Sequence, residues 1–247
     1  MSTTATRRQA TARSAARHSP GSVLSSVAVA LGSVLFAGAF VWAALLYRPY
    51  AVPTDSMAPT IAAGERVLAE RVDGDAVRRG DVVVFEDPTW GDLPMVKRVI
   101  GVGGDTVACC DADGRLTVNG TPVPEPYLSG SGPASGTGFT AQVPKGSLFL
   151  LGDSRWNSVD SRNHLAGDTQ GAVPRSAVRA RVDATAWPLE QAGLIQRPAG
   201  FAQLPGGVSE PGPLPLQLAA VAVGALLILG GAAYGPVARR AGRGQRR

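Results

Sequence analysis

Histidine, cysteine and lysine are all scarce in this chain of 247 residues. It contains two histidines, two adjacent cysteines and, among twenty-four basic residues, only two lysines, Lys97 and Lys145. No His or Cys spacing typical of a metal site is present, so the sequence predicts neither a metal nor a cofactor. Only His164 lies outside the basic N-terminal tail, and its loop sequence, DSRNHLAG, predicts a solvent-exposed side chain.

Acidic residues are missing from both ends of the chain. Residues 1–47 contain four arginines and residues 214–247 contain five, and neither range contains an Asp or a Glu. All nineteen acidic residues therefore lie in the middle, where only fifteen Lys and Arg accompany them. The formal net charge of +5 is a property of the two tails, and the middle is acidic. This distribution argues against nucleic-acid binding by the central part.

Charge of either sign is absent from two long apolar segments, residues 22–46 and 213–235. About 20 apolar residues suffice for a helix to cross the hydrocarbon of a bilayer. The sequence therefore predicts transmembrane helices at residues 22–46 and 214–235. A cleavable signal peptide is the alternative for the first, but its apolar run is too long and no small-residue cleavage site follows it. A buried core helix is the alternative for the second.

Arginine-rich flanks predict the orientation of both helices. Because such flanks stay in the cytoplasm, we expect cytoplasmic tails at residues 1–21 and 236–247. The residues between the helices then form one domain on the far side of the membrane, and the protein is a multi-pass protein of the cell membrane. In this stretch we expect a folded domain at residues 48–189 and a linker rich in Gly and Pro at residues 190–213.

The folded part contains several short runs rich in Val. Such runs, bounded by Gly, Asp or Pro, are typical of strands, and they occur at residues 65–72, 80–87, 94–102, 105–123 and 146–153. The sequences DADG and NG inside the fourth run predict hairpin turns, because Gly permits a positive φ. No long amphipathic helix stands out, so the predicted fold class is mainly β.

Two further features of this part concern a loop and the cysteines. The sequence SGSGPASGTG (129–138) predicts a flexible surface loop. Cys109 and Cys110 are neighbours in the fourth strand region. A domain outside the cytoplasm permits disulfides, but adjacent cysteines can bridge only through a strained ring. We therefore expect two free, half-buried thiols, with the strained disulfide as the alternative.

Ser56, in the sequence AVPTDSMAPT, lies just beyond the first apolar segment. A serine nucleophile needs a base, because its hydroxyl is almost never ionised near neutral pH. Lys97 is a candidate, since burial lowers a lysine pKa and the strand sequence MVKRVIG places it beside Met95 on an apolar face. Arginine cannot release its proton in this way, and Lys145, in the turn VPKGS, is expected to be solvated. A structural lysine beside Arg98 is the alternative for Lys97.

Four ordered blocks, PTDSMAPT, GDVVVF, VKRVIGVGGDTV and GDSRWNSVDSR, resemble the motifs of the type I signal peptidases (leader peptidases), in particular those of actinobacterial members. The resemblance spans residues 48 to about 175. It implies an antiparallel β catalytic domain of the signal-peptidase kind, flanked by two transmembrane helices, with a Ser–Lys dyad. The implied activity is a serine endopeptidase that removes N-terminal signal peptides from exported preproteins after small residues (Ala-x-Ala). The implied partners are these signal peptides and the lipid bilayer, with no nucleic acid and no metal.

The resemblance also implies roles for individual residues. Ser56 corresponds to the nucleophile, and Lys97 corresponds to the general base that takes its proton. The Thr54 hydroxyl and the Ser56 backbone N–H correspond to the oxyanion hole. Asp55, between them, occupies a position that varies in the family, and we expect it to face water.

Supporting and substrate-binding positions follow from the same blocks. Ser158 corresponds to the hydroxyl that orients the lysine amine. Asp160 and Arg162 correspond to a neighbouring ion pair, and Gly152 and Asp153 to the turn that brings this block to the lysine. The positions that would line pockets for small side chains are Val52, Met57, Ile61, Met95 and Val96. Ordinary core packing is the alternative for Ile61 and Met95.

One position departs from the family pattern, and two other functions stay open. Ser154 replaces the Asn usual after Gly-Asp, which puts a local hydrogen bond in doubt. A self-cleaving repressor protease would use the same dyad, but two predicted spans and the lack of a helix-turn-helix region count against it. A membrane-tethered β domain that binds partners without catalysis is the second alternative.

Overall fold

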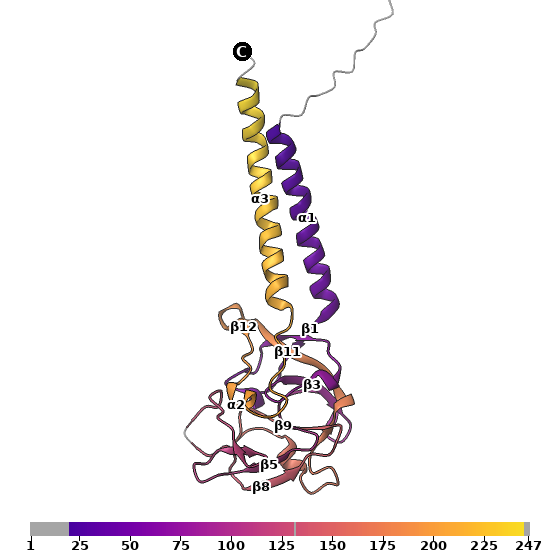
Figure 1. Ribbon diagram of the computed structural model, residues 1–247, viewed down its shortest axis with the longest axis vertical. Helices are drawn as coiled ribbons and strands as arrows, with labels where there is room; N and C mark the ends of the chain where they lie inside the picture. The colour runs from indigo at the N-terminus through magenta and orange to yellow at the C-terminus, as the bar shows by residue number, and fades with distance from the viewer. Residues whose placement is uncertain (1–19, 131, 245–247) are drawn as a thin grey trace, which may run out of the picture. The chain divides into compact units, whose positions relative to one another are not determined.

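The computed structural model describes residues 20–130 and 132–244, which form two units (Figure 1). One unit contains the helical segments up to Val41 and from Leu216 onward, and the other is a β domain, Trp42–Pro215. The two long helices are α1 (Pro20–Leu46) and α3 (Leu214–Gly244). Both are long and apolar enough to cross a membrane, with mean hydropathy of 2.2 in Pro20–Leu46 and 2.1 in Leu214–Val237.

Small residues let α1 and α3 approach each other closely. A Cβ atom added to Gly32 would lie 2.8 Å from the Gly224 carbonyl oxygen, so a larger residue would not fit without a shift. Ser25 Oγ donates a hydrogen bond to the Gly231 carbonyl oxygen at 2.7 Å. Such close backbone contact is common where helices pack within a bilayer. Most large apolar side chains in the described part of α3, such as Leu226, are exposed, unlike those of a buried core helix.

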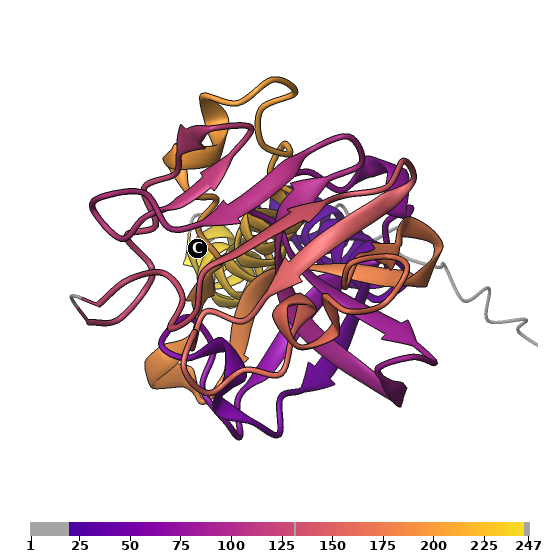
Figure 2. The ribbon, with the colours of Figure 1, turned by 90° about the horizontal axis from the view of Figure 1, so that it is seen from below.

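The β domain consists of two antiparallel sheets, which confirms the predicted mainly β class (Figures 1 and 2). In the first sheet the strand order is β1-β2-β11-β3-β4-β9-β10, and β12 pairs with β11. The order in the second is β7-β6-β5-β8. The strands of the first sheet are β1 (Tyr47–Ala51), β2 (Arg66–Glu70), β3 (Val82–Asp87), β4 (Gly91–Val102), β9 (Ser147–Leu151), β10 (Val173–Pro174), β11 (Val178–Trp187) and β12 (Gly193–Leu194). Those of the second are β5 (Thr106–Cys109), β6 (Leu116–Val118), β7 (Thr121–Pro122) and β8 (Phe139–Gln142).

Short helical turns connect the strands. Four of them carry residues discussed below: η1 (Asp55–Met57), η3 (Ser161–His164), η5 (Leu189–Gln191) and α2 (Ala199–Ala202). The remaining two are η2 (Gly74–Ala76) and η4 (Arg175–Ala177). The predicted NG turn joins β6 to β7, with φ values of 53° at Asn119 and 78° at Gly120. Positive φ at both positions matches the turn type that the sequence predicts.

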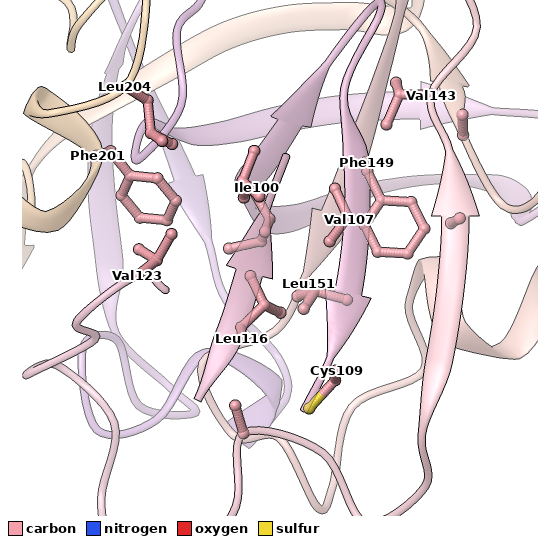
Figure 3. Close-up of a cluster of buried hydrophobic side chains, with 14 residues drawn as sticks. Ile100, Val107, Cys109, Leu116, Val123, Val143, Phe149, Leu151, Phe201 and Leu204 are labelled. Carbon is pink, nitrogen blue, oxygen red and sulfur yellow. The ribbon is translucent and has the colours of Figure 1, made fainter. Parts of the chain in front are cut away.

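Apolar side chains from both sheets share one core cluster. Ile100 and Phe149 come from the first sheet and Val107 and Leu116 from the second, and all four are fully buried (Figure 3). The removal of such apolar side chains from water is the main favourable contribution to the folding of a domain. A separate core cluster contains Met57 and holds the turn η1.

The five predicted strand regions correspond to β2, β3, β4, the group β5 to β7, and β9. The strands β1, β8, β10, β11 and β12 were not predicted, and β11 is the longest of them. Arg181 and Asp183 interrupt the apolar pattern of β11, although both are buried. Arg181 Nη2 lies 2.6 Å from Glu70 Oε2 on the neighbouring strand β2. Charged side chains can be buried when they are paired. Because the partner Glu70 lies far away in the sequence, the local pattern of β11 does not look like that of a buried strand.

Residues 190–213 are not a linker, which corrects the prediction. Phe201 is fully buried and Leu204 is 4% exposed, and both belong to the core cluster shared by the sheets. The Ile195 N–H donates to the Asp183 carbonyl oxygen at 2.9 Å, and Arg197 Nη2 donates to Asp183 Oδ1 at 3.0 Å. These contacts show that the domain extends well beyond residue 189. The prediction failed because the high Gly and Pro content of the segment outweighs its few buried apolar residues.

The loop at residues 129–138 is partly packed. Ala134 and Ser135 are each 5% exposed. Arg155 Nη1 donates to the Ala134 carbonyl oxygen at 3.1 Å, and the Ala134 N–H donates to the Gly114 carbonyl oxygen at 2.8 Å. The expected surface loop is therefore anchored near its middle, because its small residues fit under neighbouring segments.

The expectation of two free thiols was wrong, because Cys109 and Cys110 form a disulfide with each other. Cys109 is buried at the end of β5, and Cys110 is exposed just beyond it. The ring that this disulfide closes therefore lies at the end of β5, where the backbone of Cys110 is no longer part of the sheet.

Candidate active site

The candidate nucleophile lies on the turn η1, which follows β1. Ser56 is 9% exposed, while Met57 and Ile61 beside it are fully buried in the core. The Ile61 N–H donates to the Met57 carbonyl oxygen at 2.9 Å, and the Ser154 N–H donates to the Ser56 carbonyl oxygen at 3.0 Å. Apolar anchors and backbone hydrogen bonds thus fix the position of Ser56. The Ser154 bond uses the backbone, so the replacement of Asn by Ser leaves it intact.

Lys97 lies on β4, opposite Val83 of β3, and is 4% exposed. Its Nζ donates to Ser56 Oγ at 2.9 Å and to the Val96 carbonyl oxygen at 3.1 Å. The amine and the hydroxyl are therefore in direct hydrogen-bond contact. This is the geometry required for proton transfer between a base and a nucleophile.

Burial and nearby charges have opposite effects on the pKa of Lys97, and burial has the larger effect. Burial lowers the pKa of the Lys97 amine, and the carboxylates of Asp160 and Asp153 act in the opposite direction. Each carboxylate has its own arginine: Asp153 Oδ2 lies 2.6 Å from Arg98 Nη2, and Asp160 Oδ2 lies 2.8 Å from Arg162 Nη2. These ion pairs weaken the attraction of the carboxylates for an ammonium.

Thr54 and the segment around Gly152 surround the pair. Thr54 Oγ1 donates to Ser56 Oγ at 3.3 Å. The Gly152 N–H donates to Asp160 Oδ2 at 3.0 Å, and a side chain at Gly152 would overlap Ser158 Oγ and the Ser56 carbonyl oxygen. Gly152 is therefore needed for the close approach of this segment to the nucleophile.

Ser158 does not contact the lysine amine directly. Its Oγ is buried and has no hydrogen-bond partner within the described part of the chain. It lies against Gly152, close to the Ser56 carbonyl oxygen, and forms no hydrogen bond to Lys97. The structure thus brings Ser158 near the pair without the orienting hydrogen bond that the resemblance implies.

A cavity of about 610 Å³ opens beside the pair. Of the five predicted pocket residues, Val52, Met95 and Val96 line it together with Thr54, Ser56 and Lys97. Met57 and Ile61 do not, because they are fully buried in the core, so that part of the prediction is corrected. Wall residues that the sequence did not reveal are Tyr50, Val84, Trp90, Leu93, Pro94, Asn157 and Val159.

His164 is not the exposed side chain that the sequence predicts. It is half-buried and stacks on Trp90, with ring centroids 4.7 Å apart and planes 19° from parallel. The tryptophan in the turn sequence DPTWGD was the one hint in the sequence of an aromatic contact here. Only the fold shows that its ring lies next to that of His164. By contrast, Asp55 and Lys145 are exposed, as predicted.

Comparison with known proteins agrees with the four sequence blocks. Residues 23–187 match the family described as "Signal peptidase, peptidase S26". Signal peptidase I of Mycobacterium tuberculosis (strain ATCC 25618 / H37Rv) is 31% identical over 70% of this chain and 74% of its own length. The probable signal peptidase I of Mycobacterium leprae (strain TN) is 31% identical over 63% of this chain and 74% of its own length. Signal peptidase I T of Bacillus subtilis (strain 168) is 39% identical over 49% of this chain and 66% of its own length.

A solved structure of a signal peptidase I from Enterococcus faecalis V583 is also similar in sequence. It is 30% identical, the match covers 42% of this chain and 94% of that one, and the TM-score is 0.35. The family match alone covers well over half of the chain, which confirms the predicted resemblance. The chain belongs to the signal peptidase family, peptidase S26, and is a hydrolytic enzyme of that family.

Proposed function

We propose that the protein is a membrane-bound endopeptidase that removes N-terminal signal peptides from exported preproteins, with Ser56 as nucleophile and Lys97 as general base. The observation that carries the proposal is the contact of 2.9 Å between the buried Lys97 amine and Ser56 Oγ. An amine that loses its proton when desolvated can activate a serine hydroxyl.

The proposed reaction proceeds through an acyl-enzyme. Neutral Lys97 takes the Ser56 proton while Oγ attacks the scissile carbonyl carbon, and the carbonyl oxygen becomes an oxyanion. Thr54 Oγ1 and the Ser56 N–H donate hydrogen bonds to that oxygen. Protonated Lys97 then gives its proton to the leaving amine as the C–N bond breaks, which frees the mature protein. Finally, Lys97 takes a proton from water while the water oxygen attacks the ester carbon. As the ester C–O bond breaks, Lys97 returns this proton to Ser56 Oγ, and the signal peptide leaves as a carboxylic acid.

The supporting residues are proposed to hold this geometry. Asp160 accepts the Gly152 N–H at 3.0 Å while it pairs with Arg162, so it fixes the segment that covers Ser56. Ser158, beside that segment, is proposed to orient the lysine amine once substrate has entered.

The cavity walls suit an extended peptide with small side chains. Residues 50–54 form one wall and residues 93–97 another, so a substrate strand would lie between them. Strand addition of this kind supplies main-chain hydrogen bonds, while alternate side chains enter pockets. Val52, Met95 and Val96 limit the room in these pockets, which supports a preference for Ala at positions −1 and −3.

The proposed location follows from the two apolar helices. We propose that α1 and α3 cross the membrane, with both tails in the cytoplasm and the β domain outside it. Ser56 lies ten residues after the end of α1 at Leu46. A signal peptide held in the same bilayer would present its cleavage site close to the outer surface, and sharing one membrane raises the effective concentration of both partners.

Two substitutions test the proposed dyad. We expect Ser56→Ala and Lys97→Arg each to lower cleavage of a preprotein with an Ala-x-Ala site by about 10⁴-fold or more, measured with purified protein in detergent. Lys145→Arg is the matched control, because Lys145 is exposed, and should cleave at the wild-type rate. All variants should accumulate in the membrane. Normal cleavage by Lys97→Arg would exclude Lys97 as the base.

A further inference from the structure

Trp90 and His164 form a stacked pair at the wall of the cavity, outside the proposed catalytic machinery. We infer that Trp90, supported by His164, is a specificity-determining residue that limits the size of the substrate side chain accepted on the lysine side of the groove. This inference rests on the proposed function, because it concerns the same groove.

Trp90 lies in the turn before β4 and packs against the same core cluster as Met95. Side chains two residues apart point to the same face of a strand, so Met95 and Lys97 share one face of β4. Met95 is paired with Phe85 of β3, and the rings of Trp90 and Phe85 pack with their planes 86° apart and their centroids 5.3 Å apart. Trp90, Met95 and Lys97 all line the cavity. Trp90 therefore forms part of the cavity wall on the face of β4 that bears Met95 and Lys97.

The position of Trp90 is fixed by its turn. The Trp90 N–H donates to the Asp87 carbonyl oxygen at 3.0 Å, and the Thr89 N–H donates to Asp87 Oδ1 at 2.8 Å. Gly91 follows with a φ of 118°, a value that favours glycine. The backbone of Trp90 is thus fixed by its turn, and its ring is held between Phe85 and the stacked ring of His164.

The stack also joins two segments of the chain that line the cavity. His164 ends η3, whose first turn is closed by a capping box between Asp160 and Asn163. The same stretch of chain carries Asn157 and Val159, which line the cavity as Trp90 does. The rigid Trp90 ring, supported by His164, therefore limits the size of the substrate side chain. The neighbouring Met95 has three rotatable bonds and can adapt to a larger one.

The substrate side chains that reach this wall are predictable from the extended peptide. The side chains at positions −1 and −3 point the same way, because they are two residues apart. One methylene more or less in an apolar pocket changes kcat/KM by about 10- to 200-fold. Removal of the indole should therefore relax the selection against larger apolar side chains at one or both positions.

The test compares four proteins on one peptide series. Full-length wild type, Trp90→Ala, His164→Ala and His164→Phe are assayed in detergent with peptides that carry Ala, Val or Leu at position −1 or −3. Trp90→Ala should raise the ratio of kcat/KM for Val or Leu over Ala by about 10-fold or more, and His164→Ala should change it in the same direction. His164→Phe should match wild type, because the ring is kept and His164 Nε2 has no hydrogen-bond partner within the described residues.

The outcomes separate this inference from the proposed function. Cleavage by wild type that is lost in Ser56→Ala, together with unchanged ratios in folded Trp90→Ala and His164→Ala, would overturn the inference alone. Cleavage that persists in Ser56→Ala would overturn the proposed function. The pH dependence of kcat/KM should be the same in all four proteins, since neither ring contacts the amine. A variant whose pH dependence of kcat/KM is shifted, while its ratio of kcat/KM for Val or Leu over Ala is unchanged, would contradict a role in specificity.

Discussion

At the scale of single residues, the central feature is an amine that forms no ion pair within the described part of the chain. Lys97 is 4% exposed, and among the described residues its amine hydrogen-bonds to a hydroxyl and a backbone carbonyl. A buried charge without a partner is costly, so a buried lysine tends to become neutral. The nearby carboxylates of Asp153 and Asp160 are already paired with Arg98 and Arg162. In the proposed mechanism, the amine then needs no charge to balance these carboxylates and can accept a proton.

Gly152 offers a test of the geometry at the same scale. Gly152→Ala would place a methyl group against Ser158 Oγ and the Ser56 carbonyl oxygen. We expect a loss of about 10²-fold in kcat/KM, because a displacement of about 1 Å has an effect of that size. Gly193→Ala is the control, since nothing lies within 4 Å of the added carbon there, and it should cleave normally. Wild-type activity in Gly152→Ala would show that this close contact does not position the nucleophile.

At the scale of elements, the segment between η5 and α3 belongs to the β domain and contributes to its core. Phe201, in α2, is fully buried against residues of both sheets. Arg197 pairs with Asp183 of β11 at 3.0 Å, and the two residues of β12 pair with the same strand. A peptide that only connected the domain to α3 would make none of these contacts.

Phe201→Ala tests whether the segment stabilises the domain. We expect the free energy of unfolding to fall by about 3–5 kcal/mol, the usual cost of removing a buried phenyl ring. Leu189→Ala, at a side chain that is 73% exposed, should change it by less than about 0.5 kcal/mol. Both values are measured by urea unfolding of the full chain in detergent. Equal stability of the two variants would mean that the segment is a tether after all.

Sequence patterns predicted the elements that follow local rules. The Val-rich strands and the Asn119–Gly120 turn are set by neighbours in the chain, so they could be predicted. Ser56 and Lys97 could be found because lysine is rare and the motif blocks occur in order. The strand β11, the packing of Phe201 and the stack of His164 on Trp90 depend on partners far away in sequence, and local patterns contain no information about such partners.

At the scale of the whole molecule, two apolar helices enclose the β domain in sequence, and basic tails lie outside both. Arginine next to a span disfavours its transfer across the membrane. A hairpin of two spans with basic ends would therefore keep both ends on one side and expose everything between them on the other.

The proposed topology is tested with full-length protein in cells. A reporter that is active only in the cytoplasm should be active when fused to either end, and external protease should degrade only the stretch between the helices. A middle domain that is protected from external protease while the termini are cut would reverse the proposed orientation.

Titration of the Lys97 amine is the most direct measurement of the proposed chemistry. Lys97 and Lys145 are the only lysines in the chain, so NMR of isotope-labelled lysine in the full-length protein gives two side-chain signals, and Lys145→Arg assigns them. Because burial lowers the pKa of Lys97, we expect its proton to leave well below the ordinary lysine pKa of about 10.4. Cleavage should then rise with pH over the same range, since only the neutral amine accepts the Ser56 proton. A Lys97 amine that is still fully protonated at about pH 9, in protein that cleaves its substrate, would contradict the proposed mechanism.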